Sequence, residues 1–366
     1  MSETIQKQNY KQTEVGLIPE DWEVKSLDEL TVRVGDGIHS TPKYTENGDY
    51  LFINGNNLVN GKIIITNDTK NVDISEQKKH SRELNNQTIL LSINGTIGNV
   101  AYYNNEKILL GKSAAYLNIK KSFPREFFYY SIQTPEIQIF FENNLTGSTI
   151  KNLGLNTIRK AQIPFPPNLT EQRSIATALS DVDELLTSLE QLISKKQAIK
   201  QGAMQELLTP PSQGGKRLPG FSGKWEKKKL GEIAEIRDGT HQTPTYVETG
   251  IPFYSVENIT KNDFQNTKFI SKGDHELLTK KFKINKGDIL MTRIGSIGEC
   301  KFIDWNVNAS FYVSLALMKI KSNDSPEYIC HYSKTESFKK DVEINSLQSA
   351  IPKKINLGPI SNINIE

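Results

Sequence analysis

The sequence predicts an α+β protein in which two similar mixed α/β domains are separated by one long helix of the coiled-coil type. Motifs recur in the same order in both halves of the chain, and short apolar runs precede Gly-x-x-Gly turns in each half. An apolar heptad stripe lies between the halves. The 366 residues, 36% hydrophobic and 24% charged, suit two ordinary folded domains.

Composition narrows the functional classes. The first residues, MSETIQKQNYK, lack the apolar core of a secretory signal, and no stretch approaches the roughly 20 apolar residues that span a bilayer. We therefore expect a cytoplasmic protein with no membrane partner. Two cysteines, Cys300 and Cys330, are too few for a disulfide framework. The net charge of +3 neither demands nor excludes nucleic acid.

The first domain is expected over residues 1–167. The segment from Trp22 to Leu27 predicts an opening strand with Trp22 in the core. DGIHSTPKY, from Asp36 to Tyr44, predicts a shaped loop in which Gly37 takes unusual backbone angles and Pro42 stiffens the exit. ILLSINGTIGN, from residue 89 to residue 99, predicts a strand followed by a tight turn.

A long helix is expected within residues 168–208, after a proline-rich start and a cap at 170–173. Its apolar residues follow heptad spacing, which is typical of a coiled-coil seam. The seam comprises Ile175, Leu179, Val182, Leu186, Leu189 and Ile193. At about 1.5 Å per residue the helix would be roughly 58 Å long.

The charges of this helix are segregated, with acidic residues early and basic residues late. The acidic group is Glu171, Asp181, Asp183, Glu184 and Glu190, and the basic group is Lys195, Lys196 and Lys200. This order favours an antiparallel partner of similar sequence. The alternative is an amphipathic helix packed on its own domain.

Residues 209–224 are rich in Pro, Gly and Ser and predict a linker. The second domain, expected over residues 225–366, repeats the motifs in order, with Trp225 again placed in the core. DGTHQTPTY runs from Asp238 to Tyr246, and ILMTRIGSIGE runs from residue 289 to residue 299. The segment from Ser349 to Glu366 aligns with the segment from Ser148 to Pro167, which precedes the long helix. We therefore expect no helix to follow the second copy.

Sequence signatures of catalysis are broken or missing. Gly111-Lys112-Ser113 resembles the end of a phosphate loop, but Glu106 stands where that loop needs glycine. Glu23-Val24-Lys25 resembles part of a nuclease motif, yet its counterpart near Trp225 lacks the second carboxylate that metal-dependent cleavage needs. His39 and His241 beside their aspartates leave a metal site open as a minor alternative.

The polar loops instead suit contacts with DNA, because Gln reads adenine, Ser and Thr serve bases or phosphate, and Lys binds phosphate or guanine. Arg293 is a candidate reader of guanine, and its counterpart is the apolar Ile93. The predicted DNA-binding residues of the first half are His39, Ser40, Thr41, Lys43, Tyr44, Asn54, Asn56, Asn57, Asn94 and Thr96. Those of the second half are His241, Gln242, Thr243, Thr245, Tyr246, Ser255, Glu257, Asn258, Arg293 and Ser296.

Together these segments resemble the specificity subunit of type I restriction-modification systems. The resemblance rests on TEVGLIPEDWEVKSLDEL (Thr13 to Leu30), the two DGxHxTP loops, IPFPPNLTEQRSIA (Ile163 to Ala176) and GGKRLPGFSGKW (Gly214 to Trp225). It covers essentially the whole chain.

The resemblance implies a non-catalytic subunit in which two target-recognition domains each read half of a bipartite DNA site. It also implies that long helices pair as an antiparallel coiled coil, set the half-site spacing and dock modification subunits. Those partners would methylate adenine with S-adenosylmethionine, and restriction subunits would use ATP and Mg²⁺. This chain itself is expected to bind no cofactor.

The expected absence of a second helix departs from the family pattern. Two chains would then pair their helices, or another subunit would supply the mate. The alternative function is a stand-alone DNA-binding or assembly-modulating protein that competes with or sequesters complex subunits. Differences between the copies indicate where two half-sites are read: Ile38 against Thr240, Ser40 against Gln242, and Lys43 against Thr245.

Overall fold

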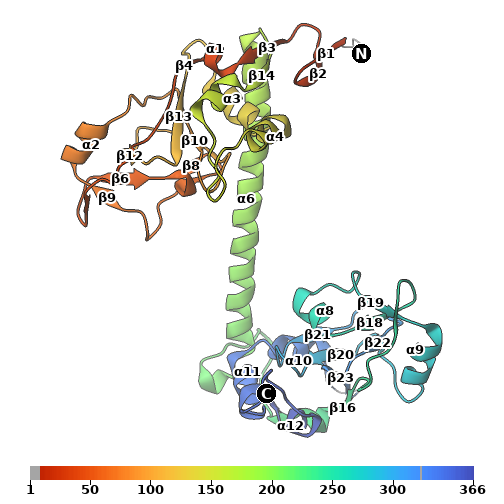
Figure 1. Ribbon diagram of the computed structural model, residues 1–366. Helices are drawn as coiled ribbons and strands as arrows, with labels where there is room; N and C mark the ends of the chain where they lie inside the picture. The colour runs from red at the N-terminus through yellow and green to blue at the C-terminus, as the bar shows by residue number, and fades with distance from the viewer. Residues whose placement is uncertain (1–8, 322–323) are drawn as a thin grey trace. The chain divides into compact units, whose positions relative to one another are not determined.

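The computed structural model describes residues 9–321 and 324–366. The chain divides into two compact units between Glu190 and Gln191. One continuous helix, α6 (Leu169–Leu207), contains this division and is 39 residues long (Figure 1). The predicted fold class, two repeated sheet-and-helix domains with a long helix between them in the chain, is confirmed.

The first domain consists of short strands and short helices. Its strands are β1 (Tyr10–Thr13), β2 (Gly16–Pro19), β3 (Glu23–Ser26), β4 (Thr31–Asp36), β5 (Tyr44–Thr45), β6 (Tyr50–Ile53), β7 (Leu58–Val59), β8 (Lys62–Ile63), β9 (Asn71–Val72), β10 (Thr88–Ser92), β11 (Val100–Tyr102), β12 (Ile108–Leu110), β13 (Ala114–Ile119) and β14 (Gln162–Phe165). Its helices are α1 (Leu27–Leu30), α2 (Ile74–His80), α3 (Arg125–Ile132), α4 (Pro135–Asn143) and α5 (Leu155–Lys160).

Two four-stranded sheets form the body of this domain. The first, in the order β11-β10-β13-β4, is antiparallel, and the second, in the order β12-β6-β9-β5, pairs β12 with β6 in parallel. Strands β10 and β13 are buried on both faces, so alternate side chains enter different cores. Ile89 and Leu91 join the core that contains helical residues such as Phe128, whereas Leu90 packs with Ile53 of the second sheet.

The second domain repeats this arrangement. Its strands are β15 (Lys228–Lys229), β16 (Ala234–Asp238), β17 (Tyr246–Val247), β18 (Ile251–Tyr254), β19 (Lys268–Ile270), β20 (Ile289–Thr292), β21 (Cys300–Phe302), β22 (Ser310–Phe311), β23 (Leu315–Ile320) and β24 (Asn364–Ile365). Its helices are α7 (Leu230–Ile233), α8 (Val256–Lys261), α9 (Lys272–Thr279), α10 (Pro326–Tyr332), α11 (Glu336–Ile344) and α12 (Leu357–Ser361). The sheet orders β16-β23-β20-β21 and β17-β19-β18-β22 match those of the first domain.

In each domain the strand just before the first short helix pairs with the domain's last strand. β3 pairs with β14, and β15 pairs with β24. A glutamate fixes the helix that follows the opening strand: Ser26 N donates to Glu29 Oε2 at 2.8 Å, and Lys229 N donates to Glu232 Oε2 at 2.9 Å. Hydrogen bonds from the Ser26 hydroxyl and N–H lower the pKa of Glu29.

The expected core positions of Trp22 and Trp225 are wrong, because both side chains are only half-buried. Trp22 donates its indole Nε1–H to Glu171 Oε1 at 3.1 Å. An indole needs such a polar partner when it is partly removed from water. Trp22 therefore ties the start of the first domain to the first turn of α6.

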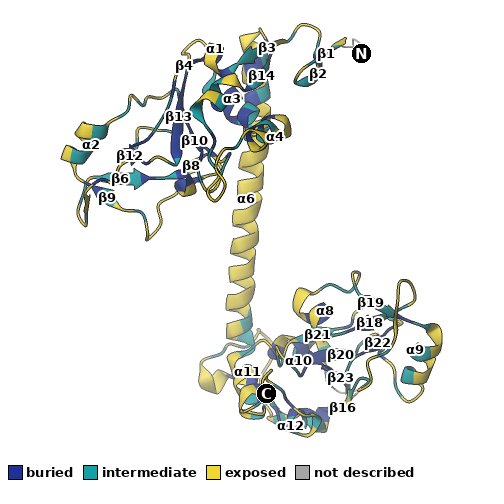
Figure 2. Cartoon of the chain, viewed as in Figure 1, coloured by how far each residue is buried: buried dark blue, intermediate teal, exposed yellow. Residues whose placement is uncertain are grey.

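Only the beginning of α6 packs into the first domain. Gln172 Nε2 donates to the Pro166 carbonyl at 2.7 Å, and Ala176 is buried in the domain core. From Asp181 to Ala203 every residue is exposed, as the colour of the helix in Figure 2 shows. The last bond to the first domain is at Asp183, whose Oδ2 accepts from the Tyr130 hydroxyl at 2.8 Å, so the alternative of a helix packed on its own domain holds only for the turns up to this residue.

Candidate nucleic-acid interface

Loops from separate parts of the chain meet at one end of the antiparallel sheet in the first domain. Strand β4 ends at Asp36 and β10 ends at Ser92, and both ends pair with the first residues of β13, Ala114 and Ala115. Because neighbouring strands are antiparallel, the loops after β4 and β10 and the turn before β13 all leave the sheet at this end.

Two backbone bridges connect these loops. Ile38, after β4, forms a parallel bridge with Gly111, and Asn94, after β10, forms an antiparallel bridge with Asn152. We call this surface the first loop edge. It comprises residues 36–44, 93–99, 111–113 and 146–152.

The second domain builds the same surface with the same two kinds of bridge. Thr240 bridges Tyr312 in parallel, and Ile294 bridges Lys354 in antiparallel. We call this surface the second loop edge. It comprises residues 238–246, 293–299, 312–314 and 347–354. The repeat in the sequence is therefore also a repeat in backbone geometry.

Gly37 and Gly239 are required for a different reason from the one expected. The prediction of unusual backbone angles is wrong, because neither residue has a positive φ. A Cβ atom on Gly37 would lie 2.2 Å from the Leu110 carbonyl oxygen, and one on Gly239 would lie 2.2 Å from that of Phe311. Two backbones cross too closely here for any side chain.

Positive φ angles occur instead in the Gly-x-x-Gly turns. Gly95 and Gly98 have φ of 77° and 89°, and Gly295 and Gly298 have φ of 85° and 89°. These values lie in the left-handed region that glycine adopts without steric cost. The tight turns predicted after β10 and β20 are confirmed.

The aspartate and histidine of each DGxHxTP loop pair with each other. His39 Nε2 lies 2.7 Å from Asp36 Oδ2, and His241 Nε2 lies 2.8 Å from Asp238 Oδ2. Both histidine side chains are 72% exposed. The carboxylates thus orient imidazoles that stay accessible. Across residues 9–321 and 324–366, no group of three or more His, Cys, Asp and Glu is placed to hold a metal ion.

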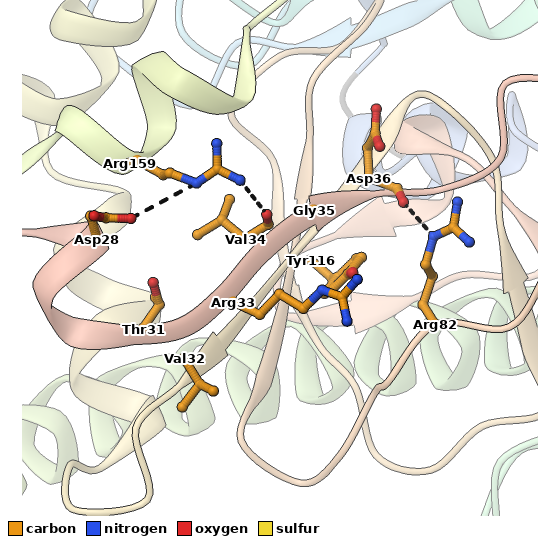
Figure 3. A pocket seen from close by; sticks show the side chains of 10 residues that line it. All are labelled: Asp28, Thr31, Val32, Arg33, Val34, Gly35, Asp36, Arg82, Tyr116 and Arg159. Atoms are coloured by element: carbon orange, nitrogen blue, oxygen red, sulfur yellow. Dashed lines mark hydrogen bonds and ion pairs between the residues drawn. The ribbon is translucent and has the colours of Figure 1, made fainter.

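Two arginines hold the outer edge of β4, the strand that leads into the first loop (Figure 3). Arg159 Nη2 donates to the Val34 carbonyl at 2.7 Å. Arg82 donates to the carbonyls of Asp36, at 2.8 Å, and Gly37, at 3.2 Å. β4 is the edge strand of its sheet, so the arginines satisfy carbonyls on its open side and fix where the loop begins.

A polar hollow of about 480 Å³ lies along this edge of β4. Its charged groups largely balance: Arg33 pairs with Glu83 at 3.3 Å, and Arg159 lies 3.8 Å from Asp28. The hollow therefore supports the strand edge and has little excess charge for an anion.

Arg293 holds the loop of the second domain. It is 4% exposed; its Nη1 lies 3.1 Å from Asp238 Oδ2, and its Nε donates to the Ile355 carbonyl at 3.2 Å. We expected this residue to read guanine, and the structure corrects that prediction. A buried guanidinium bonded inside its own domain does not present its donors to a base edge.

Most of the other predicted DNA-binding side chains are exposed on the two loop edges, and their contact with DNA stays a prediction. The exposed set is His39, Ser40, Thr41, Lys43, Tyr44, Thr96, His241, Gln242, Thr243, Thr245, Tyr246 and Ser296. Asn94 is half-buried. Ile38 is only 3% exposed. Its side chain is not accessible to DNA, so the difference between Ile38 and Thr240 is not one that DNA could contact.

The predicted asparagine strip has two buried members. Asn57 accepts a hydrogen bond from Asn54 N, and Asn258 accepts one from Ser255 N, both at 2.9 Å. These side chains close the turns after β6 and β18, so their predicted DNA contacts are corrected to a structural role. Asn54, itself half-buried, accepts from Ser113 Oγ at 2.9 Å.

The remaining members of the strip are exposed or partly exposed. Asn56 and Glu257 are exposed, and Ser255 is half-buried. Glu257 pairs with Lys261 Nζ at 2.6 Å. A carboxylate repels phosphate, so Glu257 suits a base contact better than a backbone contact.

Sequence reasoning missed several exposed side chains of the loop edges. They are Lys112, Ile150 and Lys151 on the first edge and Ile351 and Lys353 on the second. The aligned segments STIK and SAIPKK already contained a signal for four of them. The sequence contained no such signal for Arg82, because its hydrogen bonds to the carbonyls of Asp36 and Gly37 join segments that are distant in the chain.

The apolar seam of α6 is largely open. Leu179, Val182, Leu186, Leu189 and Ile193 are between 42% and 56% exposed. Ile175 differs, because it packs against the core of the first domain. The seam available to a partner therefore begins at Leu179. In the described residues, no helix combines the length and apolar character needed to cross a membrane.

Residues 19–201 and 222–366 match the family model described as the type I restriction modification DNA specificity domain. The chain is 29% identical over 309 residues to the type I restriction enzyme MjaIX specificity subunit of Methanocaldococcus jannaschii. That match covers 78% of this chain and 69% of the relative.

Two solved structures share the fold. The type I restriction-modification S subunit from M. genitalium has a TM-score of 0.60 and 20% identity, with 94% of this chain and 84% of that chain covered. A chain from work on complex assembly and conformational transition of the type I R-M system has a TM-score of 0.55 and 18% identity, with 95% and 86% covered.

Proposed function

We propose that this chain, which belongs to the type I restriction-modification DNA specificity family, is the sequence-specific DNA-recognition subunit of a type I restriction-modification complex. The observation that carries the proposal is the pair of loop edges. Each has the same backbone bridges, but the exposed side chains on it differ between the copies.

Each loop edge would read one half of a bipartite site in duplex DNA. The exposed differences are Ser40 against Gln242 and Lys43 against Thr245. Gln pairs with adenine in two hydrogen bonds, whereas Lys binds guanine or phosphate. Two edges with one scaffold and different donors would therefore select two different half-sites.

The long helix would set the spacing between the half-sites. A helix of 39 residues resists bending far more than a flexible linker of the same length. Major grooves on one face of DNA recur about every 34 Å, so a rigid spacer restricts which grooves two domains reach together.

The chain would work with catalytic partners and without chemistry of its own. Modification subunits would dock on the helix and methylate adenine with S-adenosylmethionine, and restriction subunits would supply ATP- and Mg²⁺-dependent cleavage. The relative's name, a specificity subunit, supports this division of labour.

The open seam of α6 would also pair with a second helix. Its exposed apolar residues and its segregated charges favour an antiparallel mate, such as α6 of a second copy. Pairing of two copies would bury the acidic end of each helix against the basic end of the other.

A reconstituted methylation assay tests the proposal. The full chain is co-expressed with the modification subunit of its own system, and transfer of labelled methyl groups to unmodified DNA is measured. We expect methylation only when both proteins are present. Methylation by the modification subunit without this chain, or none by the assembled complex, would contradict the proposal.

A further inference from the structure

Each loop edge carries one isoleucine that is far more exposed than a folded protein needs. Ile150 is 69% exposed and Ile351 is 99% exposed. They occupy matching places, in the loops 146–152 and 347–354. An apolar side chain held in water at the same place in both copies points to a ligand that covers it.

Both loops are closed and anchored by backbone hydrogen bonds. Thr146 and Asn152 exchange two bonds, of 2.9 Å and 2.8 Å, and Leu347 N donates to the Lys354 carbonyl at 2.8 Å. The chain that leaves each loop is bonded to the residue after the central strand: Leu153 N donates to Ile93, and Ile355 N to Arg293. The isoleucines therefore stand on fixed loops beside the base-reading loops.

A lysine accompanies each isoleucine. Lys151 is exposed and directly follows Ile150, and Lys353 lies two residues after Ile351. Lys353 Nζ lies 2.6 Å from Glu343 Oε1, yet its side chain stays 57% exposed. An apolar contact beside a cationic contact matches the surface of a DNA groove, where sugars and base edges lie between phosphates.

We propose that Ile150 with Lys151 and Ile351 with Lys353 are sequence-independent DNA contacts. Each isoleucine packs against deoxyribose sugars along a groove, and each lysine binds a neighbouring phosphate. The inference rests on the proposed function, because it takes duplex DNA as the ligand of the loop edges. These pairs recur in both copies, whereas Ser40 and its counterpart Gln242 differ, so they hold DNA without selecting its sequence.

Salt-dependent binding of the full chain to a mixed-sequence 40-base-pair duplex tests the inference. Each neutralised phosphate contributes about 0.9 to the slope of log affinity against log salt, so Lys151→Ser with Lys353→Ser should lower that slope by about 1.8. Ile150→Ser with Ile351→Ser should weaken binding roughly tenfold and leave the slope unchanged.

Matched controls use exposed residues away from the loop edges. Leu17→Ser with Leu218→Ser removes two apolar side chains that are 64% and 55% exposed, and should leave affinity unchanged. Lys121→Ser with Lys286→Ser removes exposed lysines near the ends of β13 and β20 that lie opposite the loop edges, and should leave the slope unchanged.

The outcomes separate the inference from the proposed function. Wild-type affinity and slope in both test variants would overturn the inference while the proposed function stands. Loss of co-purification with the modification subunit, with DNA binding intact, would also overturn it and assign the surface to a protein partner. A wild-type chain that binds no duplex DNA at any salt concentration, alone or with that subunit, would overturn both.

Discussion

Arg293 Nη1 lies 3.1 Å from Asp238 Oδ2, on the carboxylate oxygen that also lies 2.8 Å from His241 Nε2. One carboxylate therefore couples a buried guanidinium to an exposed imidazole in the DGxHxTP loop of the second domain. The first domain has Ile93 at the position of Arg293 and holds its loop with Arg82 instead. Two homologous loops are thus positioned by arginines from different parts of the sequence.

Replacing Arg293 by methionine should destabilise the second domain. The change removes charge-assisted hydrogen bonds to Asp238 and Ile355, which contribute about 1.5–3 kcal/mol when a charged group is involved. Denaturant unfolding measures this loss. Arg237→Met is the control: Arg237 pairs with Glu235 on the surface, so its loss should change the free energy of unfolding by about 0.5 kcal/mol or less.

The same arginines give a prediction about specificity. In a functional complex, Arg293→Lys should relax recognition of one half-site, and Arg82→Lys should relax recognition of the other. A lysine keeps the charge but loses the planar array of donors. Methylation of duplexes with one altered half-site measures each effect. Equal relaxation of both half-sites by either variant would contradict the assignment.

Gly37→Ala and Gly239→Ala should each cost about 1–3 kcal/mol, because the new methyl group meets a carbonyl oxygen of the crossing backbone. Gly202→Ala should have the opposite effect on stability. It lies in α6 with open space around its Cβ position, so it should stabilise the helix by up to about 1 kcal/mol. Thermal unfolding of the three variants provides the comparison.

Exchange of the differing loop residues should transfer specificity. The double change Ser40→Gln and Lys43→Thr gives the first loop the exposed side chains of the second. We expect altered base preference in one half-site and an unchanged preference in the other. Sequencing of methylated products from a randomised duplex library measures both. Unchanged preference in both halves would place base recognition outside these two positions.

Leu186→Gln with Leu189→Gln should weaken pairing of α6 with another helix, because both side chains lie exposed on the seam. Sedimentation of the full chain measures its self-association. Thr177→Gln with Ser188→Gln is the control, since these exposed residues lie on the other face of the helix. A wild-type chain that stays monomeric at all concentrations would contradict pairing of two copies.

The regular parts of the fold were predictable from the sequence, and the family resemblance is confirmed. Heptad spacing predicted α6 and an apolar seam from Ile175 to Ile193, of which the structure leaves the part from Leu179 onward open. Apolar runs before Gly-x-x-Gly predicted β10 and β20 with their turns, because positive φ angles leave a glycine signature.

The local sequence does not reveal a residue's role where contacts with distant segments of the chain determine that role. Gly37 is required by a crossing with Leu110, and Arg82 acts on a carbonyl far away in the chain. Arg293 appears as a base reader in sequence because nothing local signals that Asp238 and Ile355 will enclose it. Tertiary contacts of this kind leave no periodic pattern.

The most direct test is genome-wide methylation mapping in a cell that expresses this chain with its modification subunit. We predict one bipartite motif with methylated adenine, absent when this chain is deleted, and altered in a single half by the Ser40 and Lys43 exchange. A map without any motif dependent on this chain would contradict it and favour a protein that competes with or sequesters complex subunits.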